Sequence, residues 1–370
     1  MAVRIATFNA ENLMQRFDFS GWRNDLRRDR ALQMFDIRDK EHFEELEQAR
    51  VVAHTDDAMQ LTALAIAQTR ADIICLQEVE NLEALKAFEY GYLFKMIGQG
   101  YRHKYLVDGN DGRGIDVAVM MRDETSTGEP IEFVSMKSHA HVTFADFGLH
   151  NKGLKERNLE ATERVFKRDC LEIDVKVGGR LLTLFVVHFK SMSGGRDGMD
   201  GRSWTMPVRK AESRAVRQII EKKFGKGKTE GKRWIVCGDL NDYRSRIVVS
   251  GTPYDGYSFE TVAEKVSGID PLLSDGFSFN LCERMQELER WTLYHSRGPD
   301  ERHLCQLDYL LVSPHLAEKN PETIPEIIHA GQPWRTPFPP DQNVDRYPRT
   351  GWDRPKASDH SPVVAEISLL

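Results

Sequence analysis

Six apolar runs recur along the chain, and each is bordered by polar residues that can carry chemistry. The pattern is clearest where Trp-Ile-Val-Cys at 234–237 is followed by Gly-Asp-Leu-Asn-Asp at 238–242. Because side chains alternate across a strand, Asp239 and Asn241 would point the same way while Leu240 points back into the core. One such ending is ordinary turn chemistry. Six of them together predict a sheet protein with a polar site collected at its strand ends.

The other five runs supply amide, carboxylate and imidazole groups. They lie at 4–8, 72–77, 181–187, 305–312 and 362–367. The polar residues that accompany them are Asn9 and Glu11, Glu78, His188, Asp308, and Asp359 with His360. Helices are expected between them at 55–69, 81–88 and 207–224, where capping residues and helix formers occur. The alternation of strands and helices indicates a mixed α/β protein.

The order of these polar residues resembles the endonuclease/exonuclease/phosphatase superfamily, the family of deoxyribonuclease I. Three short motifs carry the resemblance: Leu-Gln-Glu at 76–78, Gly-Asp-Leu-Asn-Asp at 238–242 and Ser-Asp-His at 358–360. Two further segments, 113–118 and 187–191, are more similar to the bacterial nuclease-like branch than to the lipid phosphodiesterases. The resemblance implies a four-layer sandwich in which two mixed β-sheets pack face to face and helices cover the outer faces.

We therefore expect a single domain of this family over 1–370, with an insertion near 17–54 and a long loop near 319–357. The insertion is expected to contain a helical part at 40–50. The loop is rich in Pro, Arg and aromatic residues between 331 and 356, which predicts irregular structure. Its Arg335, Arg346, Arg349 and Trp352 could contact bases or phosphates by charge and stacking.

The composition is that of a soluble globular protein, with 40% hydrophobic and 29% charged residues. The chain begins without a signal-peptide pattern, and no stretch approaches the roughly 20 apolar residues that a membrane span needs. We expect a cytoplasmic protein that does not bind membranes, and no protein partner can be inferred. The five cysteines are dispersed without a Cys-x-x-Cys pair, so neither a disulfide framework nor a zinc site is indicated.

One segment stands out against the net charge of −6, which argues against a surface that coats nucleic acid throughout. From 202 to 233 the chain has eleven Lys and Arg residues and three Glu. The segment is either a solvated helix or a patch that faces phosphates. Its place between the His188 and Asp239 motifs favours substrate binding.

Hard oxygen ligands without a thiolate suit Mg²⁺ or Mn²⁺ rather than zinc. Glu78 and Asn9 would supply such ligands, and Asp359 would complete the set, with Asp308 or Glu11 as alternatives. The cation would act as a Lewis acid on a phosphoryl oxygen.

The catalytic candidates follow from the needs of phosphodiester cleavage. His360, held by the Asp308 carboxylate, is the first candidate for the base that activates water. His188 would act as a general acid or electrophile at the phosphate. Asp239 and Asn241 would position the water and the phosphate, and the alternative assignment makes Asp239 the base.

Three more residues are candidates for contact with substrate, namely Lys190, Arg113 and Asp116. Asp116 is either an inward polar group that supports the site or an ordinary residue at the start of a strand. The leading hypothesis is a Mg²⁺- or Mn²⁺-dependent nuclease with DNA or RNA as substrate. The alternatives are a phosphatase or phosphodiesterase acting on a small metabolite or a lipid head group, and a non-catalytic nucleic-acid-binding module.

Overall fold

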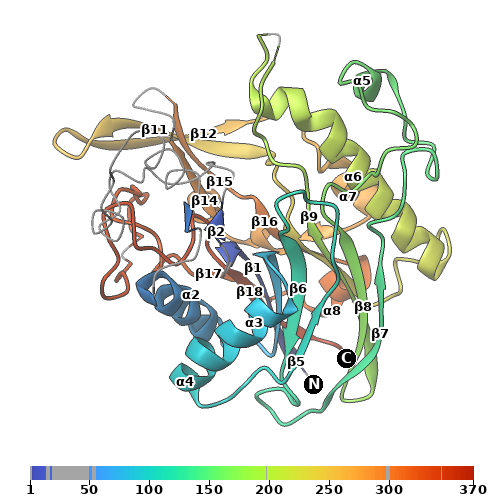
Figure 1. Cartoon of the computed structure of the whole chain (residues 1–370), viewed down its shortest axis with the longest axis horizontal. Coiled ribbons are helices and arrows are strands. Elements are labelled where there is room, and N and C mark those ends of the chain that lie inside the picture. The colour runs from blue at the N-terminus through green and yellow to red at the C-terminus, as the bar shows by residue number, and fades with distance from the viewer. Residues whose placement is uncertain are drawn as a thin grey trace, which may run out of the picture.

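The computed structural model describes residues 2–13, 56–196, 198–296, 301–342 and 344–370 (Figure 1). It also describes the backbone of a two-stranded sheet formed by β2 (Phe17–Asp18) and β3 (Arg50–Val51). The rest of the predicted insertion near 17–54, including the helical part expected at 40–50, lies outside the described residues.

The first sheet has the strand order β17-β18-β1-β4-β6-β5. Its strands are β1 (Ala2–Leu13), β4 (Ile73–Val79), β5 (His103–Leu106), β6 (Asp116–Met121), β17 (Glu326–Ile327) and β18 (Val363–Ser368). Strands β1 and β4 run parallel, with Asn9 opposite Gln77. Their carboxyl ends therefore open onto the same edge of the sheet, as the sequence predicts for the residues that follow them.

The second sheet has the order β13-β16-β10-β9-β8-β7. Its strands are β7 (Ile131–Ser138), β8 (Cys170–Val177), β9 (Arg180–His188), β10 (Trp234–Asp239), β13 (Phe279–Asn280) and β16 (Asp308–Val312). Strand β10 is parallel to β9 and antiparallel to β16, so Asp239 is the register partner of both His188 and Asp308. Register alone thus places three of the candidate residues side by side.

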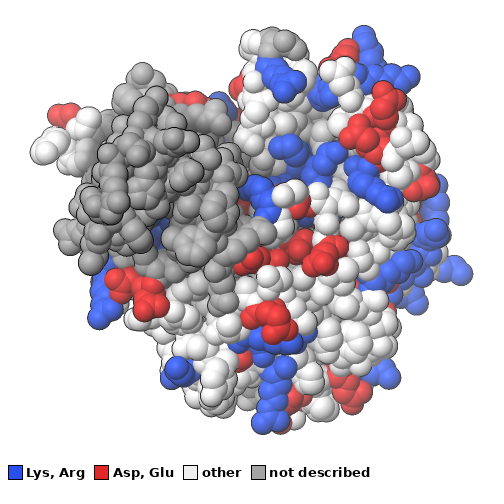
Figure 2. Space-filling view, in the orientation of Figure 1, with Lys and Arg blue, Asp and Glu red and all other residues white. Residues whose placement is uncertain are grey.

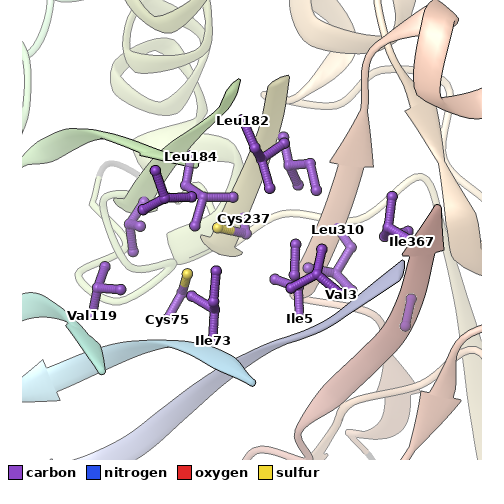
Figure 3. Close-up of a cluster of buried hydrophobic side chains, with 14 of the residues drawn as sticks. Val3, Ile5, Ile73, Cys75, Val119, Leu182, Leu184, Cys237, Leu310 and Ile367 are labelled. Carbon is purple, nitrogen blue, oxygen red and sulfur yellow. The ribbon is translucent and has the colours of Figure 1, made fainter. Parts of the chain in front are cut away.

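The inner faces of the two sheets pack on each other and form the central core. Figure 3 shows Val3, Ile5 and Ile73 of the first sheet facing Leu182 and Leu184 of the second. These side chains are fully buried. Burial of an aliphatic side chain of this size contributes about 1.5–3 kcal/mol to folding.

Helices cover the outer face of each sheet, which confirms the four-layer α/β sandwich (Figure 1). The first sheet is covered by α2 (Asp56–Thr69), α3 (Leu82–Phe88), a π-helical turn at Glu89–Leu93 and α4 (Phe94–Ile97). The second is covered by α6 (Gly201–Phe224) and α7 (Asp270–Leu273). The short helices α5 (Lys152–Lys155) and α8 (Pro314–Lys319) lie in connections. Short 3₁₀ turns occur at Ser274–Gly276, Leu281–Arg284 and Glu287–Glu289.

A third sheet, β12-β11-β15-β14, extends the sandwich at one end. Its strands are β11 (Ser245–Thr252), β12 (Gly256–Ala263), β14 (Leu293–Ser296) and β15 (Arg302–Cys305). The single strand expected at 305–312 is therefore wrong, because β15 ends at Cys305 and β16 begins at Asp308 in another sheet. Between them the backbone N–H of Leu307 donates to Thr292 Oγ1 (2.9 Å), which turns the chain from one sheet to the next.

Helix α6 begins six residues before the predicted start at Pro207. Asp200 caps the helix by accepting a hydrogen bond from the backbone N–H of Ser203 (2.9 Å). The irregular loop expected at 331–356 is confirmed for its described residues, none of which is in a helix or strand. In the described part of the chain, no helix is both long and apolar enough to cross a membrane.

Candidate active site

The Asp239 carboxylate lies at the centre of the polar strand ends. Its Oδ2 accepts hydrogen bonds from Asn9 Nδ2 (3.0 Å) and Asn241 Nδ2 (2.9 Å), and its Oδ1 accepts one from the Asn241 backbone N–H (2.8 Å). His188 Nε2 and His360 Nε2 lie 3.5 and 3.8 Å from the same Oδ2. The structure thus brings together residues from β1, β9, β10 and the last loop, as the sequence predicts.

Gly238 explains how β10 delivers this carboxylate. Its φ is +143°, and a Cβ at this position would lie 1.9 Å from the carbonyl oxygen of Val187 on β9. Only glycine allows the two strands to approach so closely where they end. Asn241, Glu78 and Glu11 also adopt positive φ of 49°, 62° and 49°, a conformation that is uncommon for non-glycine residues.

Opposite electrostatic environments surround the two histidines. Burial, followed by the positive charges of Arg168 and Arg113, lowers the pKa of His188 well below its ordinary value. Burial also acts to lower the pKa of His360, but the carboxylates of Asp308 and Asp239 outweigh it and raise that pKa well above the ordinary value. His188 is therefore neutral and His360 cationic at neutral pH.

The Asp308 carboxylate contacts and orients the His360 ring. Its Oδ2 lies 2.7 Å from His360 Nδ1, and the whole residue is buried. The Asp308 backbone N–H donates to Thr292 Oγ1 (3.2 Å), which fixes the carboxylate at the start of β16. The pKa of Asp239 is also raised, to about 7. Burial is the main cause and the charge of Asp308 adds to it, while the charge of His360 acts in the opposite direction.

Glu78 lies at the end of β4 and Asn9 in the second half of the neighbouring strand β1, and both side chains offer hard oxygen donors. Glu78 Oε2 accepts a hydrogen bond from Asn12 Nδ2 (2.6 Å), and its Oε1 lies 4.0 Å from His188 Nε2. In the residues that the structure describes, no three His, Cys, Asp or Glu side chains form a ready-made metal cluster. Glu78, Asp359 and the Asn9 amide oxygen are all hard oxygen donors, the type that Mg²⁺ and Mn²⁺ prefer, and their assignment as ligands stays a prediction.

Both alternatives for completing that set are engaged elsewhere. Asp308 faces the His360 ring. Glu11 is buried, and its oxygens are held by Arg354 Nη2 (2.7 Å), Lys356 Nζ (3.0 Å) and the backbone N–H of Asp359 (2.8 Å). Glu11 is thus held at both oxygens, whereas Asp308 uses only Oδ2 for the His360 ring.

Three basic side chains, Lys190, Arg113 and Arg168, lie near His188. Lys190 Nζ donates to Ser191 Oγ (3.0 Å), and burial, then the charge of Arg168, lowers the pKa of Lys190 to about 8. Arg113 and Arg168 share the Asp111 carboxylate at 3.1 and 2.8 Å. Basic and acidic side chains meet in the middle of the face shown in Figure 2. A site with anionic oxygens at one side and ammonium and guanidinium groups at the other suits an anionic substrate.

Asp116 is placed differently from the other two substrate-binding candidates. It is buried at the start of β6, where its Oδ1 accepts a hydrogen bond from the backbone N–H of Gly109 (2.7 Å). Burial raises the pKa of Asp116 to about 6. Its printed hydrogen bond is to the backbone of a neighbouring loop, and both readings of Asp116, as a supporting group or as an ordinary residue at the start of a strand, stay predictions.

Only the start of the basic segment 202–233 lies beside the site, where Arg209 Nη1 donates to the backbone carbonyl of Lys190 (3.2 Å). The expectation from its place between two motifs is wrong for the C-terminal part of the segment. Its last residue precedes Trp234, which is the first residue of β10, whereas Asp239 is the last. Six strand residues separate the two ends of β10 by about 17 Å. Lys222, Lys226 and Lys228 are exposed near that far end.

The two arginines nearer the site are used within the protein. Arg202 Nε and Arg209 Nε donate to the two oxygens of Asp242 (2.8 and 2.9 Å). Toward the far end of β10, Lys223 Nζ binds Glu172 (2.7 Å) and Asp174 (2.8 Å). These ion pairs fasten α6 to the second sheet, so the charge of these three residues is structural.

Sequence reasoning missed several residues that shape the site. Arg168, Arg354 and Lys356 come from loops without a motif, and nothing in their local sequence indicates which carboxylate they bind. Asp242 had a signal, since it ends the Gly-Asp-Leu-Asn-Asp motif. Its buried side chain anchors two arginines and the backbone N–H of Gly268 (2.9 Å), which supports the turn that carries Asn241.

The sequence profile of the Endonuclease/Exonuclease/phosphatase family matches residues 49–360. The chain belongs to this family, whose members are phosphoric ester hydrolases. No curated protein sequence matches the chain significantly.

Solved structures share the fold at low sequence identity. TDP2 from C. elegans aligns with 99% of this chain and 75% of its own, at 14% identity and a TM-score of 0.51. The human Nocturnin catalytic domain with bound sulfate aligns over 99% and 94%, with the same identity and TM-score. The mannosyl-6-phosphatase Bt3783 of Bacteroides thetaiotaomicron aligns over 99% and 100%, at 14% identity and a TM-score of 0.50. At this level of identity the likeness concerns the fold alone.

Proposed function

We propose that the chain is a Mg²⁺- or Mn²⁺-dependent phosphodiesterase that hydrolyses the phosphodiester bonds of DNA or RNA. The observation that carries the proposal is the Asp239 carboxylate placed between a neutral and a cationic histidine. This arrangement provides a proton acceptor and a fixed positive charge within one small site. Both are needed when water attacks an anionic phosphoryl group.

In the proposed mechanism, Asp239 takes the proton from the attacking water. A pKa of about 7 suits a general base at neutral pH, and the amides of Asn9 and Asn241 orient the carboxylate. His360 cannot accept that proton because it is already protonated. We therefore favour Asp239 as the base, the second of the two assignments that the sequence left open.

His360 then acts as a cation that stabilises negative charge on the phosphoryl oxygens, and Asp308 keeps it protonated and oriented. His188 is a neutral donor beside the phosphate, and Lys190 with Arg113 attracts the anionic substrate. Glu78, Asn9 and Asp359 would hold the divalent cation, which when bound would act as a Lewis acid on a phosphoryl oxygen.

A second candidate function is hydrolysis of a small phosphorylated molecule. The observation that favours it is the position of the basic segment, because Lys222, Lys226 and Lys228 lie away from the site and cannot guide a polymer into it. The local cations Lys190 and Arg113 would suffice for one phosphate group. Among proteins of the same fold, Bt3783 of Bacteroides thetaiotaomicron is a mannosyl-6-phosphatase.

A direct assay separates the two candidates. The purified chain would be incubated with labelled single- and double-stranded DNA, RNA, a bis-aryl phosphodiester and an aryl phosphomonoester, each with Mg²⁺, Mn²⁺ or EDTA. We expect cleavage of a nucleic acid and of the diester with either cation, and none in EDTA. Cleavage of the monoester alone would favour the small-molecule phosphatase, and activity in EDTA would contradict metal dependence.

A further inference from the structure

Glu11 is a buried carboxylate held by two side-chain cations from the last loop. Arg354 Nη2 lies 2.7 Å from its Oε1, and Lys356 Nζ lies 3.0 Å from its Oε2. Glu11 and Lys356 are only 4% and 6% exposed. A buried charge pair of this kind is held firmly, because separating it would leave an unpaired charge away from water.

The place of Glu11 makes this pairing unusual. It follows Asn9 by two residues at the end of β1, and its backbone N–H donates to Asn9 Oδ1 (3.0 Å). Its Oε2 also accepts the backbone N–H of Asp359 (2.8 Å). Glu11 therefore touches both Asn9 and Asp359, which are candidate ligands of the divalent cation. A free carboxylate in this position would be a natural ligand for a second cation.

We propose that Lys356 is a resident cation of the site, which occupies Glu11 and restricts the chain to one divalent cation. The inference rests on the proposed metal-dependent function. A second divalent cation at Glu11 would have to displace an ammonium group that is already in contact with the carboxylate, and the two positive charges would repel each other. Arg354 reinforces the effect by holding the other oxygen.

The pairing also gives Lys356 and Glu11 a positioning role. Ser358 Oγ donates to the backbone carbonyl of Asn9 (2.8 Å), and the His360 backbone N–H donates to Ser358 Oγ (3.0 Å). These Ser358 contacts, together with the hydrogen bond from the Asp359 backbone N–H to Glu11 Oε2 (2.8 Å), fasten the loop that carries Asp359 and His360 onto the last part of β1. Gln at position 11 keeps an oxygen that can accept this hydrogen bond.

The test is the number of Mn²⁺ ions bound per folded chain, measured by calorimetric titration and by electron paramagnetic resonance of free Mn²⁺. We expect one ion for the wild-type protein and two for Arg354→Met combined with Lys356→Met, in which both side-chain cations that contact Glu11 are removed. Lys356→Arg, which keeps a cation at this position, should bind one. The double variant Glu11→Gln with Lys356→Met removes both charges, and it should bind one ion with an affinity within about threefold of wild type.

Three results would overturn the inference. Two ions bound to the wild-type protein would show that Lys356 does not exclude the second one. One ion bound to the folded Arg354→Met/Lys356→Met variant would show that these cations are not what excludes it. Loss of the ion, or affinity about 100-fold weaker, in the Glu11→Gln/Lys356→Met variant would show that Glu11 itself is a ligand. If the Arg354→Met/Lys356→Met variant fails to fold, as judged by circular dichroism, the wild-type count and the Glu11→Gln/Lys356→Met variant still decide. One ion bound without any hydrolysis would refute the proposed function and leave this inference standing.

Discussion

At the scale of single residues, the Asp308–His360 contact determines which group carries the proton. Asp308 contributes a negative charge 2.7 Å from the His360 ring, and this contact raises the pKa of His360 against the effect of burial. Below that raised pKa the ring is cationic, and above it the charge is lost. The proposed role of His360 therefore depends on a residue that does not itself touch substrate.

We predict that Asp308→Asn lowers kcat by at least about tenfold and moves the alkaline limb of the kcat profile to lower pH. The amide keeps the shape of the side chain and removes the charge, so His360 loses its proton at a lower pH than in the wild-type protein. The measurement is kcat against pH with a bis-aryl phosphodiester. An unchanged alkaline limb in the folded variant would contradict a cationic role for His360.

Lys190 gives a second pH dependence with a defined position. Its pKa is lowered to about 8, so the ammonium is present below that pH and lost as the pH rises through it. We predict that KM for an anionic substrate rises above pH 8 while kcat changes little. Lys190→Arg should keep KM low at pH 9, and Lys190→Met should raise KM about tenfold already at pH 7. A flat KM profile in the wild-type protein would remove Lys190 from substrate binding.

At the scale of elements, strand register collects the site. Because β10 pairs with β9 on one side and β16 on the other, His188, Asp239 and Asp308 lie abreast. This closeness depends on Gly238, where any Cβ would collide with the backbone of β9. The Gly-Asp-Leu-Asn-Asp motif at 238–242 therefore supplies both the polar side chains of the site and the glycine that the backbone geometry requires.

We predict that Gly238→Ala lowers the free energy of unfolding by about 3 kcal/mol or more, since it combines a disfavoured φ with a backbone clash. Gly231→Ala is the matched control, because a Cβ there would meet nothing within 4 Å and its φ is not in the left-handed region. Urea unfolding of both variants measures the difference. Equal stability of the two would show that β10 can move away from β9.

The exposed lysines at the end of helix α6 and in the loop after it should not contribute to nucleic-acid binding. We predict that changing Lys222, Lys226 and Lys228 together to Glu alters nucleic-acid affinity by less than about twofold near 0.15 M salt. These groups lie near the end of β10 that is about 17 Å from Asp239. Charges separated by more than the Debye length of ~8 Å are largely screened. Filter binding or anisotropy at several salt concentrations would measure it. A large loss of affinity and a flatter salt dependence would restore this helix as a phosphate contact.

The ends of β4, β9 and β10 were predictable because the apolar runs 72–77, 181–187 and 234–237 are followed at once by polar residues or glycine. The break at Gln306 and Leu307 was not, since no Gly or Pro interrupts the run 305–312 and only the Thr292 contact shows that the chain changes sheets. Strand direction explains why the end of the basic segment lies away from Asp239, because residues that precede a strand lie at the opposite end from those that close it. The partners of Arg168 and Lys356 depend on loop packing, for which local sequence has no signal.

At the scale of the whole molecule, the site forms where the two sheets meet at one end of the sandwich. Asn9 from the first sheet donates to Asp239 of the second (3.0 Å), and the final loop adds His360 over both. The large central core fixes the two sheets relative to each other, so these contacts are maintained by packing far from the site. Loops and the third sheet then surround an arrangement that the sandwich already defines.

Hydrolysis of a labelled oligonucleotide and of a bis-aryl phosphodiester by wild-type protein and Asp239→Asn, at saturating Mn²⁺, tests the central claim most directly. Asparagine keeps the volume and most hydrogen bonds of Asp239 but cannot accept a proton from water. The account predicts metal-dependent cleavage by the wild-type protein and at least about a 100-fold lower kcat in the variant, in line with the loss of a general base. Cleavage by Asp239→Asn at the wild-type rate would contradict it.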